Sequence, residues 1–116
     1  MISIIIPSYN EAAQIEATLQ QLILLRERPF EIIVADGGST DHTIAIASNY
    51  ARVISSGKGK GLQLNTAAMH AAGEILFFVH ADMHIPPGAL MAISEHIHVK
   101  GYDGGGFINV FSKYNE

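Results

Sequence analysis

The run of five apolar residues from Ile75 to Val79 constrains the fold of this chain more than any other stretch. It is too short to cross a membrane and shows no polar alternation, so it predicts a strand buried on both faces of a parallel sheet. His80, Asp82 and His84 alternate directly after it, and a Pro-Pro-Gly turn then ends the strand. Because open α/β sheets bind ligands beyond the carboxyl ends of their strands, we expect a site here.

Further strand-like runs alternate with segments of helical spacing along the rest of the chain. We predict strands at residues 4–6, 30–35, 52–55 and 107–111, and helices at residues 12–23, 44–51 and 62–72 and after Pro87. This order predicts the α/β class, with a mostly parallel sheet flanked by helices in one domain spanning residues 1–116. Because no closing helix follows the last strand, we expect a truncated form of such a fold.

Single residues suggest where the helices begin, end and face the core. Asn10 and Asp41 have the short polar side chains of helix caps, and Gly73 is typical of a helix end. The apolar positions that follow helical spacing in the first helix are Ala12, Ile15, Leu19, Leu22 and Ile23.

The composition excludes several classes of protein. Of the 116 residues, 48% are hydrophobic and 16% are charged, which suits one domain with one core. The net charge of −4, with seven basic residues, argues against a surface that binds nucleic acid. The sequence has no cysteine, no signal-peptide pattern and no apolar run long enough for a membrane helix. We therefore expect a soluble, cytoplasmic protein, and leave open whether it attaches peripherally to the inner face of the membrane.

Polar side chains gather after the predicted strands. Since the carboxyl ends of parallel strands share one edge of a sheet, we expect these side chains to meet there. They comprise an aromatic ring, carboxylates that suit a base or ribose, two ammonium groups in a glycine loop that suit phosphate, and ligands for a divalent cation. In chain order they are Tyr9, Glu11, Asp36, Lys58, Lys60, Asp82 and His84. This set of groups fits a nucleoside diphosphate.

Several of these residues also have a plainer interpretation. Asp36 stands before Gly37 and suits a turn as well as a ligand contact. Lys58 and Lys60 fit a solvated loop, which lacks the Gly-Lys-Ser/Thr ending of a P-loop. His80 fits a neutral, hydrogen-bonded core residue as well as a ligand. The histidines expected to be structural or exposed are His42, His70, His96 and His98.

Three ordered stretches together carry a family resemblance. Residues 4–11 (Ile-Ile-Ile-Pro-Ser-Tyr-Asn-Glu), residues 34–41 (Val-Ala-Asp-Gly-Gly-Ser-Thr-Asp) and residues 73–82, which end in His-Ala-Asp, resemble successive motifs of the inverting family 2 glycosyltransferases. The Gly-Lys-x-Lys-Gly-x-Gln-x-Asn spacing at residues 57–65 is similar to that of a bacterial subgroup of this family. The resemblance spans nearly the whole chain and implies the nucleotide-sugar-binding part of a GT-A fold, without its acceptor-binding part.

The resemblance also implies roles for single residues in binding a nucleoside-diphosphate sugar, with a UDP-sugar favoured. Asp36 matches the first acid of the family's usual Asp-Asp-Gly-Ser turn, whereas Gly37 replaces the second acid, which leaves the nucleobase open. The residues implied along the nucleobase and ribose are Pro7, Tyr9 and Glu11. Those implied near the diphosphate or ribose are Lys58, Lys60 and Asn65.

A divalent cation, Mg²⁺ or Mn²⁺, is the cofactor that the resemblance implies. Asp82 matches the final aspartate of the family's Asp-x-Asp metal motif, and His80 stands where the first aspartate would be. His84 is a further candidate ligand. Such a cation would stabilise the negative charge that grows on the β-phosphate as the sugar leaves. No residue is assigned as the general base, and the acceptor is unknown.

Three functions remain open from the sequence. The first is a metal-assisted, inverting glycosyltransferase, and the second is a module that binds a nucleotide or nucleotide-sugar without transferring anything. The third, a nucleotidyltransferase, is disfavoured because Pro7-Ser8-Tyr9 stands where such enzymes carry a glycine-rich loop. The apolar last strand at residues 107–111 also predicts a homodimer, because an open strand edge invites pairing.

Overall fold

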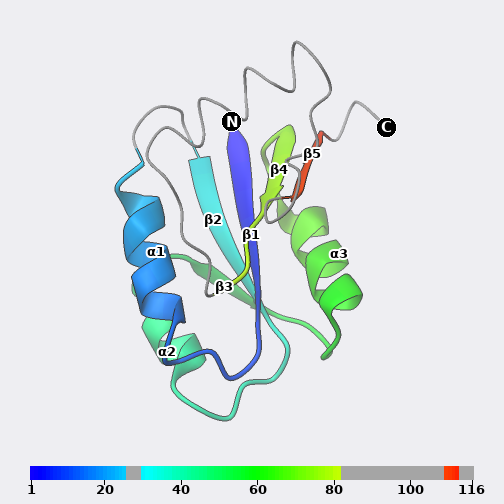
Figure 1. Ribbon diagram of the computed structural model, residues 1–116. Helices are drawn as coiled ribbons and strands as arrows, with labels where there is room; N and C mark the ends of the chain where they lie inside the picture. Colours follow the sequence, from blue (N-terminus) through cyan, green and yellow to red (C-terminus); the bar gives the residue numbers. More distant parts are fainter. Residues whose placement is uncertain (26–29, 82–108, 113–116) are drawn as a thin grey trace.

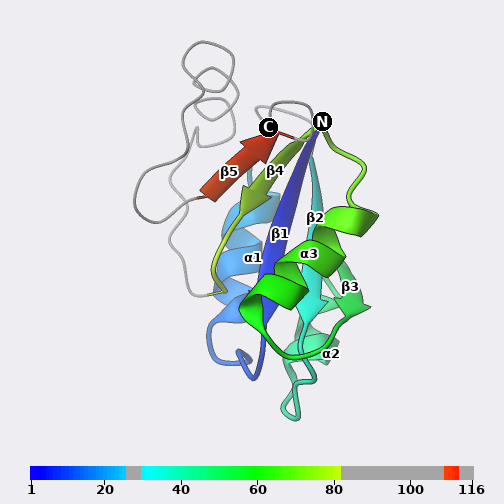
Figure 2. The ribbon, with the colours of Figure 1, turned by 90° about the vertical axis from the view of Figure 1, so that its right-hand side faces the viewer.

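A five-stranded sheet forms the middle layer of the computed structural model, which describes residues 1–25, 30–81 and 109–112 (Figure 1). Helices α1 and α2 cover one face of this sheet, and α3 covers the other (Figures 1 and 2). The elements in chain order are β1 (Ile2–Ser8), α1 (Ile15–Ile23), β2 (Phe30–Asp36), α2 (Thr43–Ala47), β3 (Arg52–Ser55), α3 (Lys60–His70), β4 (Ile75–Phe78) and β5 (Asn109–Ser112).

Strand β1 lies in the centre of the sheet, whose order is β3-β2-β1-β4-β5. It pairs in parallel with β2 on one side and with β4 on the other, and β3 continues the parallel pairing beyond β2. Only β5, among the described strands, runs antiparallel. The predicted α/β class and mostly parallel sheet are therefore confirmed. The chain moves outward from β1 through β2 to β3 and then crosses to β4, so the order reverses between β1 and β4.

The middle of strand β1 is apolar because both of its faces are buried. Along β1, Ile4 and Ile6 pack with Leu19 of α1 on one side of the sheet. Ile5 points the opposite way and packs with Ala67 of α3. Since neighbouring side chains of a strand alternate between faces, a strand sandwiched by helices needs apolar residues on both faces. Two cores, one on each face, follow from this single constraint.

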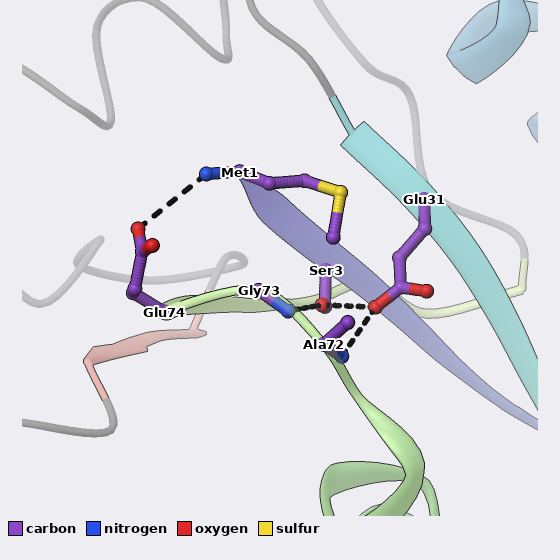
Figure 3. A network of polar contacts seen from close by, with 6 residues as sticks. All are labelled: Met1, Ser3, Glu31, Ala72, Gly73 and Glu74. Carbon is purple, nitrogen blue, oxygen red and sulfur yellow. Dashed lines mark hydrogen bonds and ion pairs between the residues drawn. The ribbon is translucent and has the colours of Figure 1, made fainter.

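A polar network ties together the amino ends of β1, β2 and the segment before β4 (Figure 3). The buried Ser3 hydroxyl donates to Glu31 Oε2 at 2.6 Å and accepts the amide of Gly73 at 2.8 Å. The amide of Ala72 also donates to Glu31 Oε2, at 2.7 Å. Burial would raise the pKa of Glu31, but these hydrogen bonds outweigh it and lower the pKa. The network lies at the edge of the parallel sheet opposite to the carboxyl ends of the strands.

The first helix starts later than the sequence predicts. Asn10 is not its N-cap, because α1 begins at Ile15 with Gln14 in the capping position. Asn10 instead has a left-handed backbone, with φ of 53°. Not every apolar residue of the helices is buried, since Ile23 of α1 and Ile44 of α2 are 38% and 41% exposed.

Gly73 does not end a helix, because α3 stops at His70 and Ala71 is already extended. Its lack of a side chain serves close packing instead. A Cβ at Gly73 would lie 2.6 Å from the Met1 carbonyl oxygen and 2.8 Å from the Ser3 nitrogen, both of them backbone atoms. The predicted helix after Pro87, with His96 and His98, lies outside the described residues. In the part of the chain that the structure describes, no helix has the length and apolarity to cross a membrane.

We predict that Gly73→Ala lowers the free energy of unfolding by about 1–3 kcal/mol, because backbone atoms of β1 must move to admit the methyl group. Urea denaturation measures this change. Gly61→Ala is the matched control, since a Cβ there, in the first turn of α3, meets no atom within 4 Å. That control should leave stability unchanged or raise it by up to about 1 kcal/mol. Equal effects of the two substitutions would contradict the packing role of Gly73.

Candidate functional site

The carboxyl ends of β1 and β2 are joined by their last residues. Ser8 and Asp36 are register partners, and the Ser8 hydroxyl donates to Asp36 Oδ1 at 2.8 Å. The amide of Gly37 donates to the Ser8 carbonyl oxygen at 2.9 Å, which extends the ladder by one bond beyond β2. The loops that follow β1 and β2 therefore start from residues that are hydrogen-bonded to each other.

Asp36 shapes the loop that follows β2. Its side chain is fully buried, and Oδ2 accepts the amides of Gly38 at 3.0 Å and Ser39 at 2.7 Å. The Ser39 hydroxyl donates to Oδ1 at 2.5 Å. Burial would raise the pKa of Asp36, but the hydrogen bonds from Ser39, Ser8 and Gly38 outweigh it and hold the pKa below its ordinary value. Of the two interpretations of Asp36, the structure gives the turn-forming one, and a direct contact with a ligand stays a prediction.

Asn10 fastens the loop after β1 to the loop after β2. The side-chain oxygen of Asn10 accepts the backbone amides of Thr40 at 2.8 Å and Asp41 at 3.3 Å. The backbone amide of Asn10 donates to the Ser39 hydroxyl at 2.8 Å. These contacts require the left-handed backbone of Asn10, which asparagine tolerates better than most residues.

Further bonds hold the next residues of the same loop. The Glu11 amide donates to Thr43 Oγ1 at 2.9 Å, and the Ala12 amide donates to Asp41 Oδ2 at 3.2 Å. Asp41 also accepts the amide and the hydroxyl of Thr43. The N-cap position of α2 is nevertheless His42, so the prediction that Asp41 is the helix cap is wrong, and Asp41 braces the turn one residue earlier. Tyr9 and Glu11 are both half-buried in this braced segment.

Gln63 of α3 is the residue that connects the third loop to the first two. Its side chain is only 4% exposed, and Nε2 donates to the carbonyl oxygens of Ser8 and Ala35, each at 2.8 Å. Its Oε1 accepts the amide of Gly59 at 3.2 Å. One amide group thus bridges the ends of β1 and β2 to the glycine loop that carries Lys58.

The glycine loop places the ammonium group of Lys58 over the ring of Tyr9, which lies in the loop after β1. Lys58 Nζ lies 4.1 Å from the centre of the Tyr9 ring, a cation–π distance. Lys58 is exposed and Tyr9 is half-buried, so both groups stay accessible from solvent at this edge of the sheet.

A pocket lies where the strand order reverses, between the ends of β1 and β4. The described residues that line it are Pro7, Lys60, Leu64, Phe78, Val79 and His80. Lys60 Nζ is 3.5 Å from His80 Nδ1 across this pocket. The Thr18 hydroxyl of α1 donates to the Ala81 carbonyl oxygen at 2.6 Å, which fixes the chain at the residue before Asp82.

The structure thus brings five of the ten predicted site residues together in two groups at one edge of the sheet. Tyr9 and Lys58 form the first, and Pro7, Lys60 and His80 form the second. His80 is partly exposed at the pocket wall, so its interpretation as a buried core residue is wrong. Asn65 is exposed and lies two residues after Gln63, which places it on a different side of α3.

The predicted metal ligands Asp82 and His84 lie outside the described residues. Within residues 1–25 and 30–81, no three histidine, aspartate or glutamate side chains are grouped so as to hold a metal ion. Ser8 and Gln63 were not predicted from the sequence as site residues, and Asn10 was predicted as a helix cap, which it is not. The signal for Gln63 was its place four residues after Gly59, within the motif that carries the lysines.

Comparison with known proteins places this geometry in a family context. The family model described as Glycosyl transferase family 2 matches residues 3–115. A dolichyl-phosphate β-glucosyltransferase from Trichomonas vaginalis is 33% identical over 94 residues, which cover 67% of this chain and 28% of that protein.

Two solved structures are similar in fold and in sequence. A mannosyltransferase from Pyrobaculum calidifontis, in complex with GDP-Man and Mn²⁺, has a TM-score of 0.74 and 27% identity over 85% of this chain and 32% of its own. TarS from S. aureus, in complex with UDP-GlcNAc, has a TM-score of 0.74 and 30% identity over 88% of this chain and 32% of its own. The chain therefore spans about a third or less of the length of these three proteins.

We predict that Asp36→Asn makes the free energy of unfolding less dependent on pH in the acid range. The lowered pKa of Asp36 means that its ionised form stabilises the fold at neutral pH, and that this contribution is lost as the pH falls below the ordinary value of 3.8 and through the folded-state pKa. Urea denaturation from about pH 5 to about pH 2 measures the loss. The variant, which lacks the titrating group, should lose less stability over this range than the unsubstituted chain, and parallel profiles would contradict the prediction.

Proposed function

This chain belongs to glycosyl transferase family 2 and has that family's GT-A sheet, and from this premise we propose that it binds a nucleoside-diphosphate sugar for inverting transfer of the sugar to an acceptor. One observation carries the proposal. Lys60 lines the pocket where the strand order reverses, and Lys58 lies over the ring of Tyr9, so two ammonium groups and an aromatic face follow the carboxyl ends of the strands. Open α/β sheets bind their ligands at such a point.

The proposed chemistry is stabilisation of the leaving group. As the bond from the sugar to the β-phosphate breaks, negative charge grows on the nucleoside diphosphate, and Lys58 and Lys60 would lower the energy of that charge. The aromatic ring of Tyr9 and the side chains of Pro7 and Glu11 are proposed to contact the nucleobase and ribose. Asn65 is kept only as a candidate contact, because it is exposed on another side of α3.

A divalent cation, Mg²⁺ or Mn²⁺, is proposed as the cofactor, and Asp82 as its main ligand. The carboxylate oxygen of Asp82 suits such hard cations, and the Thr18–Ala81 bond fixes the preceding residue beside the pocket. When bound, the cation would neutralise charge on the diphosphate. His80 and His84 remain secondary candidates.

The proposal covers the donor half of a reaction. The similar mannosyltransferase was solved with GDP-Man and TarS with UDP-GlcNAc, so relatives use different nucleobases, and a UDP-sugar is favoured here only as the first donor to test. Because the chain spans about a third or less of these proteins, a module that binds the donor without transfer is the second candidate. Residues 1–116 are proposed as the nucleotide-sugar-binding domain, and the acceptor and general base are not assigned. A cytoplasmic location, free or at the inner face of the membrane, stays a prediction.

We also predict a homodimer through the edge of β5. This strand is last in the sheet order and pairs, among the described strands, with β4 alone, and an exposed strand edge invites pairing with a second chain. Light scattering at increasing protein concentration should show a mass that rises toward that of two chains. A mass that stays at one chain would contradict the prediction.

We predict that the chain binds UDP, or GDP, in the presence of Mn²⁺, and that EDTA or Asp82→Asn abolishes most of this binding because both remove the cation from the diphosphate. Isothermal titration calorimetry with each nucleotide measures the affinity. Glu74→Gln is the control, because it neutralises an exposed carboxylate whose partner is the Met1 amino group at the opposite edge of the sheet.

Metal-dependent binding that Asp82→Asn removes would support the donor site and leave transfer to be tested with acceptors. Binding that is equally strong with EDTA would contradict the metal assignment. If the chain binds neither nucleotide under any of these conditions, the proposed function is wrong.

A further inference from the structure

We propose that Gln63 is a positioning residue, which holds the glycine loop of residues 57–59 in place and thereby sets Lys58 for contact with the diphosphate. The proposal rests on the proposed function, because the diphosphate is the group that Lys58 would meet. Gln63 itself lies beneath the surface and is not a ligand contact, since its side chain is 4% exposed.

The amide of Gln63 is fully engaged by three backbone groups from three segments. Both protons of Nε2 are used, one on the Ser8 carbonyl oxygen and one on that of Ala35. Oε1 accepts the Gly59 amide at 3.2 Å, and the backbone amide of Gln63 donates to the Gly59 carbonyl oxygen at 2.8 Å. Gln63 is therefore hydrogen-bonded to both the backbone amide and the backbone carbonyl of Gly59.

The glycine loop has little other freedom once Gly59 is held. Gly59 has φ of 141°, a conformation that residues with a side chain rarely adopt. A Cβ at Gly57 would lie 2.7 Å from a methyl carbon of Leu62, so α3 also confines the start of the loop. Lys58 lies between these two glycines, and its ammonium reaches the Tyr9 ring from this fixed backbone. Gln63 thus acts on Lys58 through the backbone of Gly59.

Gly37 leaves the space that Gln63 needs. A Cβ at Gly37 would lie 3.1 Å from Gln63 Cδ and Oε1 and 3.2 Å from Nε2, all of them closer than ordinary contact. Gly37 therefore packs directly against Gln63, and a Cβ there would force the amide to shift by a few tenths of an ångström. This pairing provides a second way to disturb the same contact without touching α3.

Gln63→Met tests the assignment, because methionine has a similar length but can neither donate to Ser8 and Ala35 nor accept from Gly59. The first readout, which needs no ligand, is hydrogen exchange at the Gly59 amide, and we expect Gln63→Met to speed it by at least about tenfold. Gly37→Ala should speed it in the same direction by a smaller factor. Gln20→Met is the matched control, because it makes the same change at an exposed position of α1.

The second readout is a double-mutant cycle on the affinity for UDP or GDP with Mn²⁺, measured by calorimetry. Gln63→Met should weaken binding by about tenfold in the unsubstituted chain, but by less than about twofold in Lys58→Met, because Lys58 has then already been removed. A residue that only supported the fold would weaken binding by the same factor in both backgrounds. Gly37→Ala serves in the cycle if Gln63→Met does not fold.

The outcomes separate this inference from the proposed function. Unchanged exchange at Gly59 in both Gln63→Met and Gly37→Ala, or equal factors in the two backgrounds of the cycle, would overturn the role of Gln63 while leaving donor binding intact. Failure of the unsubstituted chain to bind either nucleotide would overturn the proposed function, and with it the link from Gln63 to the diphosphate.

Discussion

Burial of β1 on both faces is the constraint from which the rest of the structure follows. Its side chains enter the core under α1 on one face and the core under α3 on the other, so β1 has to lie inside the sheet with helices above and below. A strand in that position needs a neighbour on each side, and β2 and β4 supply them. The reversal of strand order beside β1, and hence the pocket at Pro7 and Val79, is a consequence of the same constraint.

The candidate site depends next on how the chain satisfies backbone groups where the strands end. A buried polar group without a partner costs about 1–3 kcal/mol, so the ends of β1 and β2 need donors once the sheet ladder stops. The Gly37 amide and the Gln63 side chain donate to the Ser8 carbonyl oxygen. The Asp36 carboxylate accepts the backbone amides of the turn that follows β2. Since every one of these partners comes from the protein, the loops are shaped before any ligand arrives. Such pre-organisation lowers the cost of binding.

The sequence predicted the strands well and the loops poorly, for a physical reason. The second strand was predicted at residues 30–35 and β2 is Phe30–Asp36, because a run of buried apolar residues and the glycines that end it are local signals. Asn10 was expected to cap the following helix, yet its partners Thr40 and Asp41 stand about thirty positions away and cannot be identified from local spacing. Gly73 likewise depends on the distant Met1 and Ser3. Residue types at the site could be predicted, whereas the bonds that Gln63 and Asp36 make needed the fold.

The contact between Lys60 and His80 bears on which residue would hold a cation. A lysine ammonium only donates hydrogen bonds, so at 3.5 Å the Nδ1 atom of His80 has to be the acceptor. While this contact lasts, the Nδ1 atom of His80 faces an ammonium group and is not open to a cation. A phosphate that attracted Lys60 would release Nδ1. Lys60 and His80 are therefore coupled at the wall of the pocket, because each changes what the other can bind.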